Sequence, residues 1–454
     1  MTTINILEKI IHQSPWLENE NLIKTDFHIQ EAEKNKYVFR DEKFFNLKFL
    51  SGVYIITGPR QIGKTTHLKY LIKEKINPKN KGNFLYFNCD LLDKKSDIVD
   101  LVENFLKNFP DKKFSIFIIL DEITSVPDSI LAIKYLIDQG LKNNITYILT
   151  GSSAVNIKKT GEYLPGRRGN GQDFIFNPIS FKNFLKAQYQ KCDLNFSKNE
   201  SLEKFYLRIK RQINLNQELD KYLITGGIPK IINNFLRDKN ISLENYNTYK
   251  NWLTSEAAKN GRKEKIVKLI IERILYSVSA DVSYNSFATD IGIGSHNTIY
   301  EYLNFLEESF FIKQIYNFSF QEKKINFRKN KKIYFTDPFL FWLFGWWIFA
   351  DDKYYKNLKT NLILKSKLVE NLVFNKLNLI FEEVFFYKKK YEIDFINKNF
   401  AFECKYQNKI LFSELKELSK FPEKKFVITK NNLKLEKDIQ FLPMDLFLLL
   451  PDKF

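Results

Sequence analysis

The sequence has few of the residues that form disulfides or bind structural metals. Its 454 residues include three cysteines and four histidines. The cysteines are odd in number and widely spaced, and the histidines are scattered, so the sequence predicts neither a disulfide framework nor a zinc site. This composition fits a reducing compartment, and we expect a cytoplasmic protein.

Long apolar runs are also missing. The longest, at residues 339–350, has 12 residues, which is too short to cross a bilayer and favours a buried helix. Residues 1–20 carry three glutamates and lack a clean apolar segment, so no signal peptide is expected. From these features we expect no membrane partner.

Negative charge is scarce relative to positive charge. The chain has 53 acidic and 71 basic side chains, for a formal net charge of +18. Such a balance suits a polyanionic partner such as nucleic acid. The chain is also very rich in Lys, Asn, Ile and Phe, which an A+T-rich genome encodes readily, so genome bias is a competing explanation.

The most specific motif is GPRQIGKT at residues 58–65, which fits the Walker A pattern G-x-x-x-x-G-K-[ST]. The apolar run before it predicts a buried strand, and residues 66–72 predict a helix. In this setting backbone N–H groups face a phosphate at the positive end of the helix. Lys64 would reach the β- and γ-phosphates of ATP, and Thr65 would hold Mg²⁺. The residues expected to bind ATP here are Gly58, Pro59, Arg60, Gln61, Ile62, Gly63, Lys64, Thr65 and Thr66.

Two further strands are expected to end beside this loop. An apolar run at residues 114–120 ends in Asp121 and Glu122, as in a Walker B strand buried on both faces. Asp121 would bind Mg²⁺, and Glu122 would orient or deprotonate the attacking water. The strand at residues 145–150 leads to Thr150 and Ser152, either of which could sense the γ-phosphate. Ligands of such sheets bind at the carboxyl ends of the strands.

These segments, with LPGRRG and NPISFKNFL that follow, resemble the ATPase domain of a large prokaryotic family of AAA-type P-loop ATPases. The second half of the chain resembles the second half of that family, whose function is unknown. It does so at residues 222–229, 336–339, 392–395 and 402–405. The resemblance implies an ATP site formed by Gly58, Gly63, Lys64, Thr65, Asp121 and Glu122. No clear second sensor motif follows residue 186, and the oligomeric state stays open.

Residues 164–171 form a loop with two arginines, Arg167 and Arg168. Either side chain could contact a phosphate, within the chain or across a subunit contact, as an arginine finger does. A solvated basic loop is the competing interpretation, and the sequence does not choose between the two arginines.

The expected fold is α/β, with a P-loop NTPase parallel sheet followed by a helical lid, a winged helix-turn-helix and a small restriction-endonuclease-like domain. The predicted boundaries are residues 1–44 for an N-terminal helix and connector, 45–185 for the ATPase domain, 186–262 for the lid, 263–336 for the winged helix and 337–454 for the endonuclease-like domain. Gly226 and Gly227 interrupt the lid, either as a hinge or as a turn between helices.

The winged helix is predicted from three helical stretches and a basic hairpin. The stretches are residues 265–278, 283–291 and 295–308, and a Gly-Ile-Gly link joins the last two. Lys331 and Lys332 also belong to the expected basic wing, which would contact phosphates. The expected DNA contacts are His296, Asn297, Tyr300, Lys323, Lys324, Arg328 and Lys329. Packing against the ATPase or another protein is the alternative.

The endonuclease-like domain is predicted from a D…E-x-K arrangement on two neighbouring strands. Asp394 lies on the first strand, and Glu403 and Lys405 share a face of the second. The carboxylates would bind Mg²⁺ and Lys405 would activate water, with Glu370 of the preceding helix as a further ligand.

We expect an ATPase that is associated with DNA and couples ATP binding and hydrolysis to movement of its winged-helix and nuclease-like parts. One alternative is an Mg²⁺-dependent DNA nuclease that ATP regulates. The other is an ATP-dependent signalling switch that binds a protein partner.

Overall fold

The computed structural model describes residues 5–140, 143–151, 164–197, 199–319 and 324–451. The chain divides into two compact units. The first comprises Met1–Asn177 and Glu308–Phe310, and the second comprises Pro178–Glu307 and Phe311–Phe454.

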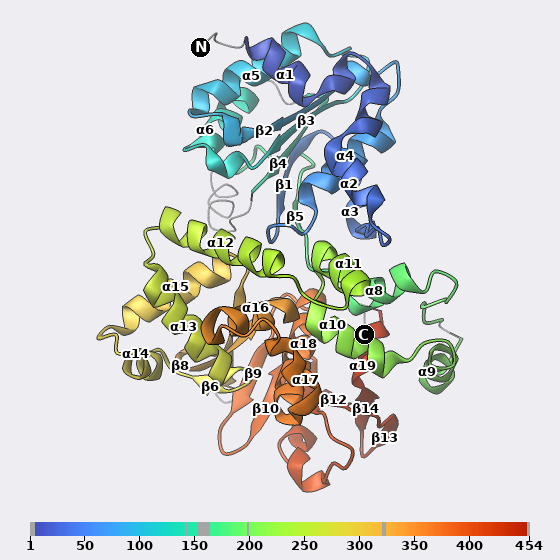
Figure 1. Cartoon of the computed structure of the whole chain (residues 1–454), viewed down its shortest axis with the longest axis vertical. Helices are drawn as coiled ribbons and strands as arrows, with labels where there is room; N and C mark the ends of the chain where they lie inside the picture. The colour runs from blue at the N-terminus through green and yellow to red at the C-terminus, as the bar shows by residue number, and fades with distance from the viewer. Residues whose placement is uncertain (1–4, 141–142, 152–163, 198, 320–323, 452–454) are drawn as a thin grey trace. The chain divides into compact units, whose positions relative to one another are not determined.

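The first unit contains a five-stranded parallel sheet in the order β2-β3-β4-β1-β5, with helices on both of its faces (Figure 1). Its strands are β1 (Gly52–Thr57), β2 (Phe84–Asn88), β3 (Ile116–Asp121), β4 (Ile145–Thr150) and β5 (Asp173–Ile175). Its helices are α1 (Ile6–Gln13), α2 (Phe27–Lys34), α3 (Glu42–Phe45), α4 (Lys64–Lys75), α5 (Lys95–Asn108) and α6 (Ser129–Asp138). Strands β1, β3 and β4 are buried along their whole length, as their apolar sequences predict for a covered parallel sheet. The α/β fold expected from the sequence is confirmed.

The N-terminal segment covers the outer edge of β2. Ser14 Oγ donates a hydrogen bond to the carbonyl of Tyr86 (2.8 Å) and accepts one from the Tyr86 N–H (2.9 Å). The indole Nε1 of Trp16 donates to the carbonyl of Phe84 (2.8 Å). An open edge strand would present these backbone groups to another chain, and here side chains satisfy them.

The second unit combines helices with a mixed sheet of nine described strands in the order β13-β14-β12-β11-β10-β9-β7-β8-β6. The strands are β6 (Asp281–Val282), β7 (Ile312–Ser319), β8 (Lys324–Phe335), β9 (Phe385–Lys388), β10 (Glu392–Ile396), β11 (Phe400–Lys405), β12 (Lys424–Thr429), β13 (Lys434–Glu436) and β14 (Ile439–Pro443). Its first helices are α8 (Phe181–Gln188), α9 (Leu202–Lys210), α10 (Leu215–Thr225), α11 (Pro229–Asp238), α12 (Leu243–Lys259) and α13 (Glu264–Ser277). The others are α14 (Tyr284–Asp290), α15 (His296–Glu308), α16 (Pro338–Phe349), α17 (Asn357–Thr360), α18 (Leu362–Ile380) and α19 (Met444–Leu449).

The apolar run at residues 339–350 forms helix α16, whose residues 338–345 are all buried, so the predicted buried helix is confirmed. Within the described ranges, every helix is too short or too polar to cross a bilayer.

The β7–β8 hairpin belongs to the same sheet as the C-terminal strands. Asn317 of β7 pairs in parallel with Phe386 of β9, and its side-chain amide donates to the carbonyl of Lys388 (3.3 Å). The expectation that Lys331 and Lys332 contact phosphates from a basic wing is wrong, because both side chains are buried in the second unit. Successive residues of a strand point to opposite faces, and here both faces are covered.

Three segments that lie far apart in the sequence meet in the second unit: residues 178–185, 222–229 and 336–339. The Gly227 carbonyl accepts the Ile179 N–H (2.8 Å), and the Gly227 N–H donates to Oδ2 of Asp337 (2.7 Å). Asp337 also caps α16, since its Oδ1 accepts the Phe339 N–H (2.9 Å). Gly226 has a φ of +59° and a ψ of −155°, which only glycine adopts readily, and an added Cβ would overlap the Asp337 carboxylate. Close packing thus requires glycine at position 226.

A Gly226→Ala substitution is expected to destabilise the protein by about 4 kcal/mol, because it adds backbone strain to a steric overlap. Urea unfolding of the purified variant measures the loss. Gly261→Ala is the control, since Gly261 also has a positive φ (+67°) but has no atom within 4 Å of an added Cβ. It should cost about 1 kcal/mol. An equal loss of stability in the two variants would mean that the overlap with the Asp337 carboxylate does not matter.

Candidate functional site

The predicted phosphate-binding loop joins β1 to α4. Gly63 is the N-cap of α4 with a φ of +94°, so the backbone turns sharply into the helix. The Lys64 ammonium is buried and donates to the carbonyls of Gly58 (2.8 Å) and Pro59 (2.9 Å). Burial lowers the pKa of Lys64, although Glu122 and Asp121 raise it. A bound phosphate would give the Lys64 ammonium a negatively charged hydrogen-bond partner in place of the two neutral carbonyls.

The other residues of the loop differ in how far they are buried. Ile62 is buried in the core of the first unit, and Gln61 is exposed with a φ of +57°. Arg60 and Thr66 are half-buried at either end of the turn. Ile62 therefore anchors the loop in the core, whereas the side chains of Arg60, Gln61 and Thr66 are at least partly exposed to solvent.

Asp121, at the end of β3, accepts hydrogen bonds from three hydroxyl groups. Thr65 Oγ1 donates to its Oδ2 at 2.6 Å, Tyr86 OH donates to the same oxygen at 2.8 Å, and Thr150 Oγ1 donates to Oδ1. The structure thus brings together Thr65, Asp121 and Thr150, as the sequence predicts. The Thr65 hydroxyl and the Asp121 carboxylate are oxygen ligands of the kind that Mg²⁺ prefers, so these residues fit that ion.

Glu122 follows Asp121 in a strained conformation. Its φ is +51°, which is rare for a residue with a side chain and costs about 1–3 kcal/mol. The Glu122 N–H donates to Thr150 Oγ1 (3.0 Å), which fixes the turn. Burial raises the pKa of Glu122, although Lys64 lowers it. A carboxylate with a raised pKa beside the loop has the properties of a general base.

Sequence reasoning missed Tyr86 and Lys69. Tyr86 lies on β2, and its hydroxyl holds Asp121. Lys69 of α4 is buried 3.5 Å from the centre of the Tyr86 ring and pairs with Asp26 (3.1 Å). Neither residue belongs to a recognisable motif, because each acts through contacts between distant segments.

The two loop arginines lie away from this edge. The Arg168 carbonyl accepts the N–H of Val53, near the start of β1, whereas the phosphate loop follows the end of β1. Arg167 pairs with Asp138 (2.7 Å) and Arg168 with Asp173 (2.5 Å). The structure therefore does not bring either arginine to the phosphate loop of its own chain. Ser152, the alternative to Thr150, lies outside the described residues.

Residues 51–185 match the family model of an AAA domain. Residues 216–345 match a domain of unknown function, DUF8612. The chain is similar to two uncharacterized proteins of Methanocaldococcus jannaschii. MJ1544 is 27% identical over 411 residues, which cover 86% of this chain and 82% of the relative. MJ1637 is 26% identical over 475 residues, which cover 95% of this chain and 90% of the relative.

Similarity to solved structures is lower. The Walker-type ATPase paby2304 of Pyrococcus abyssi has a TM-score of 0.40 and 13% identity, with 70% of this chain and 93% of that chain covered. Cdc6p from Pyrobaculum aerophilum has a TM-score of 0.26 and 13% identity, with coverages of 77% and 97%. The RuvB Holliday junction branch migration motor of Thermotoga maritima has a TM-score of 0.26 and 16% identity, with coverages of 65% and 89%.

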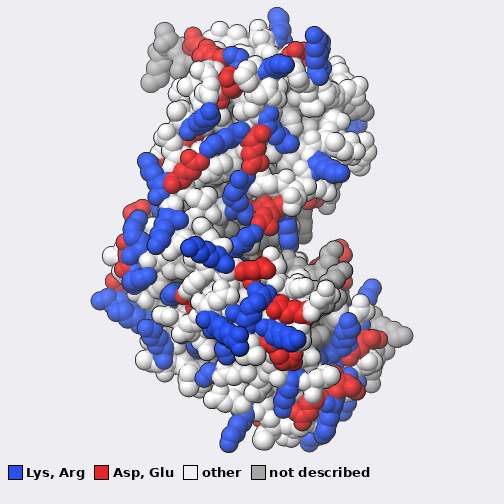
Figure 2. Space-filling model, turned by 90° about the vertical axis from the view of Figure 1, so that its right-hand side faces the viewer, with Lys and Arg blue, Asp and Glu red and all other residues white. Residues whose placement is uncertain are grey.

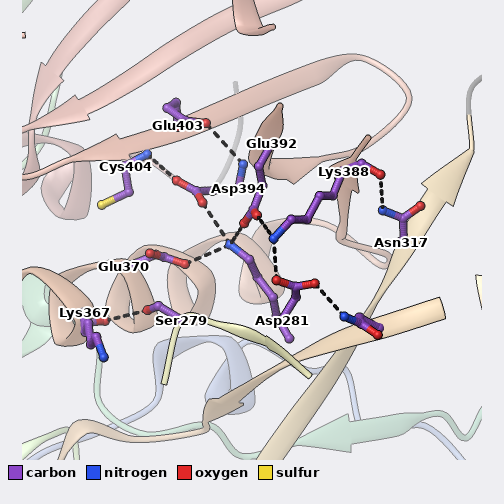
Figure 3. Close-up of polar contacts among 12 residues, drawn as sticks. Ser279, Asp281, Asn317, Lys367, Glu370, Lys388, Glu392, Asp394, Glu403 and Cys404 are labelled. Atoms are coloured by element: carbon purple, nitrogen blue, oxygen red, sulfur yellow. Dashed lines mark hydrogen bonds and ion pairs between the residues drawn. The ribbon is translucent and has the colours of Figure 1, made fainter. Parts of the chain in front are cut away.

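Outside the AAA domain, the structure brings together the four residues of the predicted nuclease-like site. Glu370 of α18, Asp394 of β10, and Glu403 and Lys405 of β11 lie in one cluster of the second unit, most of which Figure 3 shows. Glu403 Oε2 accepts the Asp394 N–H (3.3 Å), and Glu403 Oε1 pairs with Lys405 (2.8 Å). Sequence reasoning did not include Lys332 or Glu392, which also belong to the cluster.

Burial and neighbouring charge shift the pKa values of these carboxyl groups. Burial and the nearby Asp394 raise the pKa of Glu403 to about 8, although Lys405 lowers it. Burial raises the pKa of Glu370 to about 7, although Lys332 lowers it. Burial would also raise the pKa of Asp394, but Lys332, Lys405 and the Cys404 N–H together lower it. Neighbouring ammonium groups therefore favour the ionised form of Asp394, whereas burial favours the protonated forms of Glu370 and Glu403.

The predicted DNA contacts in α15 are open to solvent. His296, Asn297 and Tyr300 are exposed, and the Tyr300 ring contacts that of Tyr284. Lys324, at the start of β8, is also exposed. Lys323 lies outside the described residues, and the side chains of Arg328 and Lys329 do too. On the face drawn in Figure 2, basic side chains are spread widely with acidic ones among them.

Proposed function

We propose that the protein is an ATPase that acts on or with DNA and couples ATP binding and hydrolysis to movement of its C-terminal half. The observation that carries the ATPase activity is the convergence of Lys64, Thr65, Asp121 and Glu122 at one edge of the AAA domain's sheet. We also propose a cytoplasmic location, because three widely spaced cysteines indicate no disulfide framework and fit a reducing compartment.

Each residue of this edge has a proposed role in ATP hydrolysis. Lys64 moves from the loop carbonyls to the β- and γ-phosphates. Thr65 and Asp121 would hold Mg²⁺, which neutralises charge on the phosphates. Glu122 takes a proton from the attacking water. Thr150 donates to the Asp121 carboxylate and accepts the Glu122 N–H, so it would signal to both residues whether a γ-phosphate is bound.

Arg167 or Arg168 is proposed to contact the phosphate of a neighbouring subunit. Both precede β5 at the end of the sheet opposite the phosphate loop, so neither is suited to act within its own chain. An arginine supplied in trans stabilises charge on the transferred phosphoryl group. This role requires an oligomer.

DNA is the proposed partner of the second unit. The order α13, α14, α15 and then the β7–β8 hairpin supports a winged helix, with α15 as the recognition helix. His296, Asn297 and Tyr300 are its exposed residues, and Lys324 would contact phosphate. The net charge of +18 adds a favourable long-range attraction.

The test is ATP hydrolysis by the purified protein with and without DNA, using Lys64→Ala as the blank. We expect DNA to stimulate hydrolysis. Tyr300→Ala should weaken DNA binding about tenfold, because one good contact to a base edge contributes about 1–3 kcal/mol. Tyr276→Ala, at another exposed tyrosine of the second unit, should leave stimulation unchanged.

Two other outcomes would change the function assigned. Hydrolysis that DNA leaves unchanged, with no steep salt dependence of DNA binding, would favour a signalling switch with a protein partner. DNA cleavage that Glu403→Ala abolishes would favour an ATP-regulated nuclease. Absence of hydrolysis above the Lys64→Ala blank under all conditions would contradict the ATPase.

A further inference from the structure

A buried lysine occupies the centre of the C-terminal carboxylate cluster. The ammonium of Lys332 lies 2.6 Å from Glu392, 2.9 Å from Asp394 and 3.2 Å from Glu370. Its side chain is 1% exposed. Figure 3 shows Glu370, Glu392 and Asp394 converging from α18 and β10. Two of these three carboxylates, Asp394 and Glu370, are among the three that the sequence assigns to Mg²⁺; the third is Glu403.

The lysine matches this position in charge and in hydrogen bonding. An ammonium has three N–H donors, and three carboxylates surround it. A buried ammonium is costly unless it is paired in this way, and so is a buried carboxylate. Removing Lys332 or its carboxylate partners is therefore expected to destabilise the folded protein. Strand β8 delivers the side chain, which the adjacent pairings of Lys332 with Asp281 and Ile315 hold in register.

The same carboxylates have further partners within the protein. Tyr334 OH donates to Oε1 of Glu370 (2.8 Å), and the Cys404 N–H donates to Oδ2 of Asp394 (2.9 Å). Lys388 pairs with Glu392 (2.9 Å), and Lys405 pairs with Glu403 (2.8 Å). Oxygen atoms that a metal ion would need are therefore engaged by protein donors.

A divalent cation does not fit beside this lysine. Mg²⁺ needs oxygen ligands at about 2.0–2.1 Å in octahedral geometry. Glu370 and Asp394 could approach an ion that closely only if the ammonium between them withdrew. An ion placed there with Lys332 still present would face a like charge in a buried setting, where repulsion is poorly screened.

We propose that the Lys332 ammonium takes the place of the metal ion in the endonuclease-like fold, so that the native cluster binds no divalent cation and cleaves no phosphodiester bond. The cluster then serves as an ionic core that fastens the β7–β8 hairpin to α18 and β10. This assignment is independent of ATP hydrolysis in the AAA domain.

Titration with Mn²⁺, followed by electron paramagnetic resonance without nucleotide, tests this assignment. Native protein and Glu403→Gln are expected to bind Mn²⁺ identically, because any ion they hold lies outside the cluster. Neither should nick plasmid DNA in Mn²⁺. A Mn²⁺ ion bound by the native protein and lost in Glu403→Gln would overturn the assignment.

Removing the lysine should create the missing metal site. Lys332→Met alone removes the ammonium that Glu370, Glu392 and Asp394 share and is expected to lower the melting temperature. The double variant Lys332→Met/Glu392→Gln removes one charge of each sign and keeps Glu370, Asp394 and Glu403. It should gain one Mn²⁺ site and a Mn²⁺-dependent rise in melting temperature, both lost again with Asp394→Asn. A folded double variant that gains no Mn²⁺ site would also overturn the assignment.

Discussion

A Lys64→Ala variant is expected to bind ATP about 100-fold more weakly than the native protein. Lys64 is the buried cation beside Asp121 and Glu122 at the phosphate loop. Charge-assisted hydrogen bonds contribute about 1.5–3 kcal/mol each, so the loss of contacts to two phosphates raises the dissociation constant by about two orders of magnitude. Isothermal titration calorimetry with ATP and Mg²⁺ measures the change.

Folding should survive this substitution. Alanine removes an ammonium whose burial is unfavourable and whose hydrogen bonds go to two loop carbonyls. ATP should raise the melting temperature of the native protein and raise that of Lys64→Ala much less, since the stabilisation depends on how much ligand is bound.

Lys73→Ala is the matched control for Lys64→Ala. Lys73 lies on the same helix, α4, and pairs at the surface with Glu33 (2.7 Å). Its loss should cost less than about 1 kcal/mol of stability and leave ATP affinity unchanged. If both variants bound ATP with native affinity, the loop at residues 58–65 would not be the phosphate site.

The proposed ATP site could be located from the sequence because its residues are local in sequence. Residues 58–65 carry the loop, its lysine and its hydroxyl in one stretch, and each flanking strand is an apolar run. Asp121 and Thr150 lie at the ends of two such runs. In a parallel sheet these ends meet, so placement followed from the motif without any knowledge of side-chain packing.

The C-terminal site was only partly predictable. Glu370, Asp394, Glu403 and Lys405 could be found by their spacing, and the structure brings them together. Lys332 could not be found, because a lysine is normally exposed, and the segment that contains it also carries Arg328, Lys329 and Lys331. Its burial follows from the pairing of β7 with β9, a contact between segments nearly 70 residues apart.

A Glu122→Gln variant is expected to bind ATP normally and to hydrolyse it about 10²–10⁴-fold more slowly, which is the range for loss of a general base. Glutamine keeps the size of the side chain, and the Glu122 N–H still donates to Thr150. The side-chain amide of glutamine cannot accept a proton from water at neutral pH. Single-turnover hydrolysis and ATP titration, made on the same preparation, separate the two effects.

The pH dependence of hydrolysis gives a second test of Glu122. Burial raises the pKa of this carboxyl group, and only its ionised form can act as a base. The native rate should therefore fall as pH decreases through the raised pKa. In Glu122→Gln the residual rate should lack this acidic limb, because the titrating group is gone.

Asp128→Asn is the control for the change from carboxylate to amide at Glu122. Asp128 also has a left-handed backbone, with a φ of +55°, but its side chain is 67% exposed and pairs only loosely with Lys95 (3.7 Å). This variant should hydrolyse ATP at the native rate. Native hydrolysis by Glu122→Gln, with the acidic limb intact, would mean that Glu122 is not the base. The strained turn at residue 122 would then serve only to hold Thr150 against Asp121.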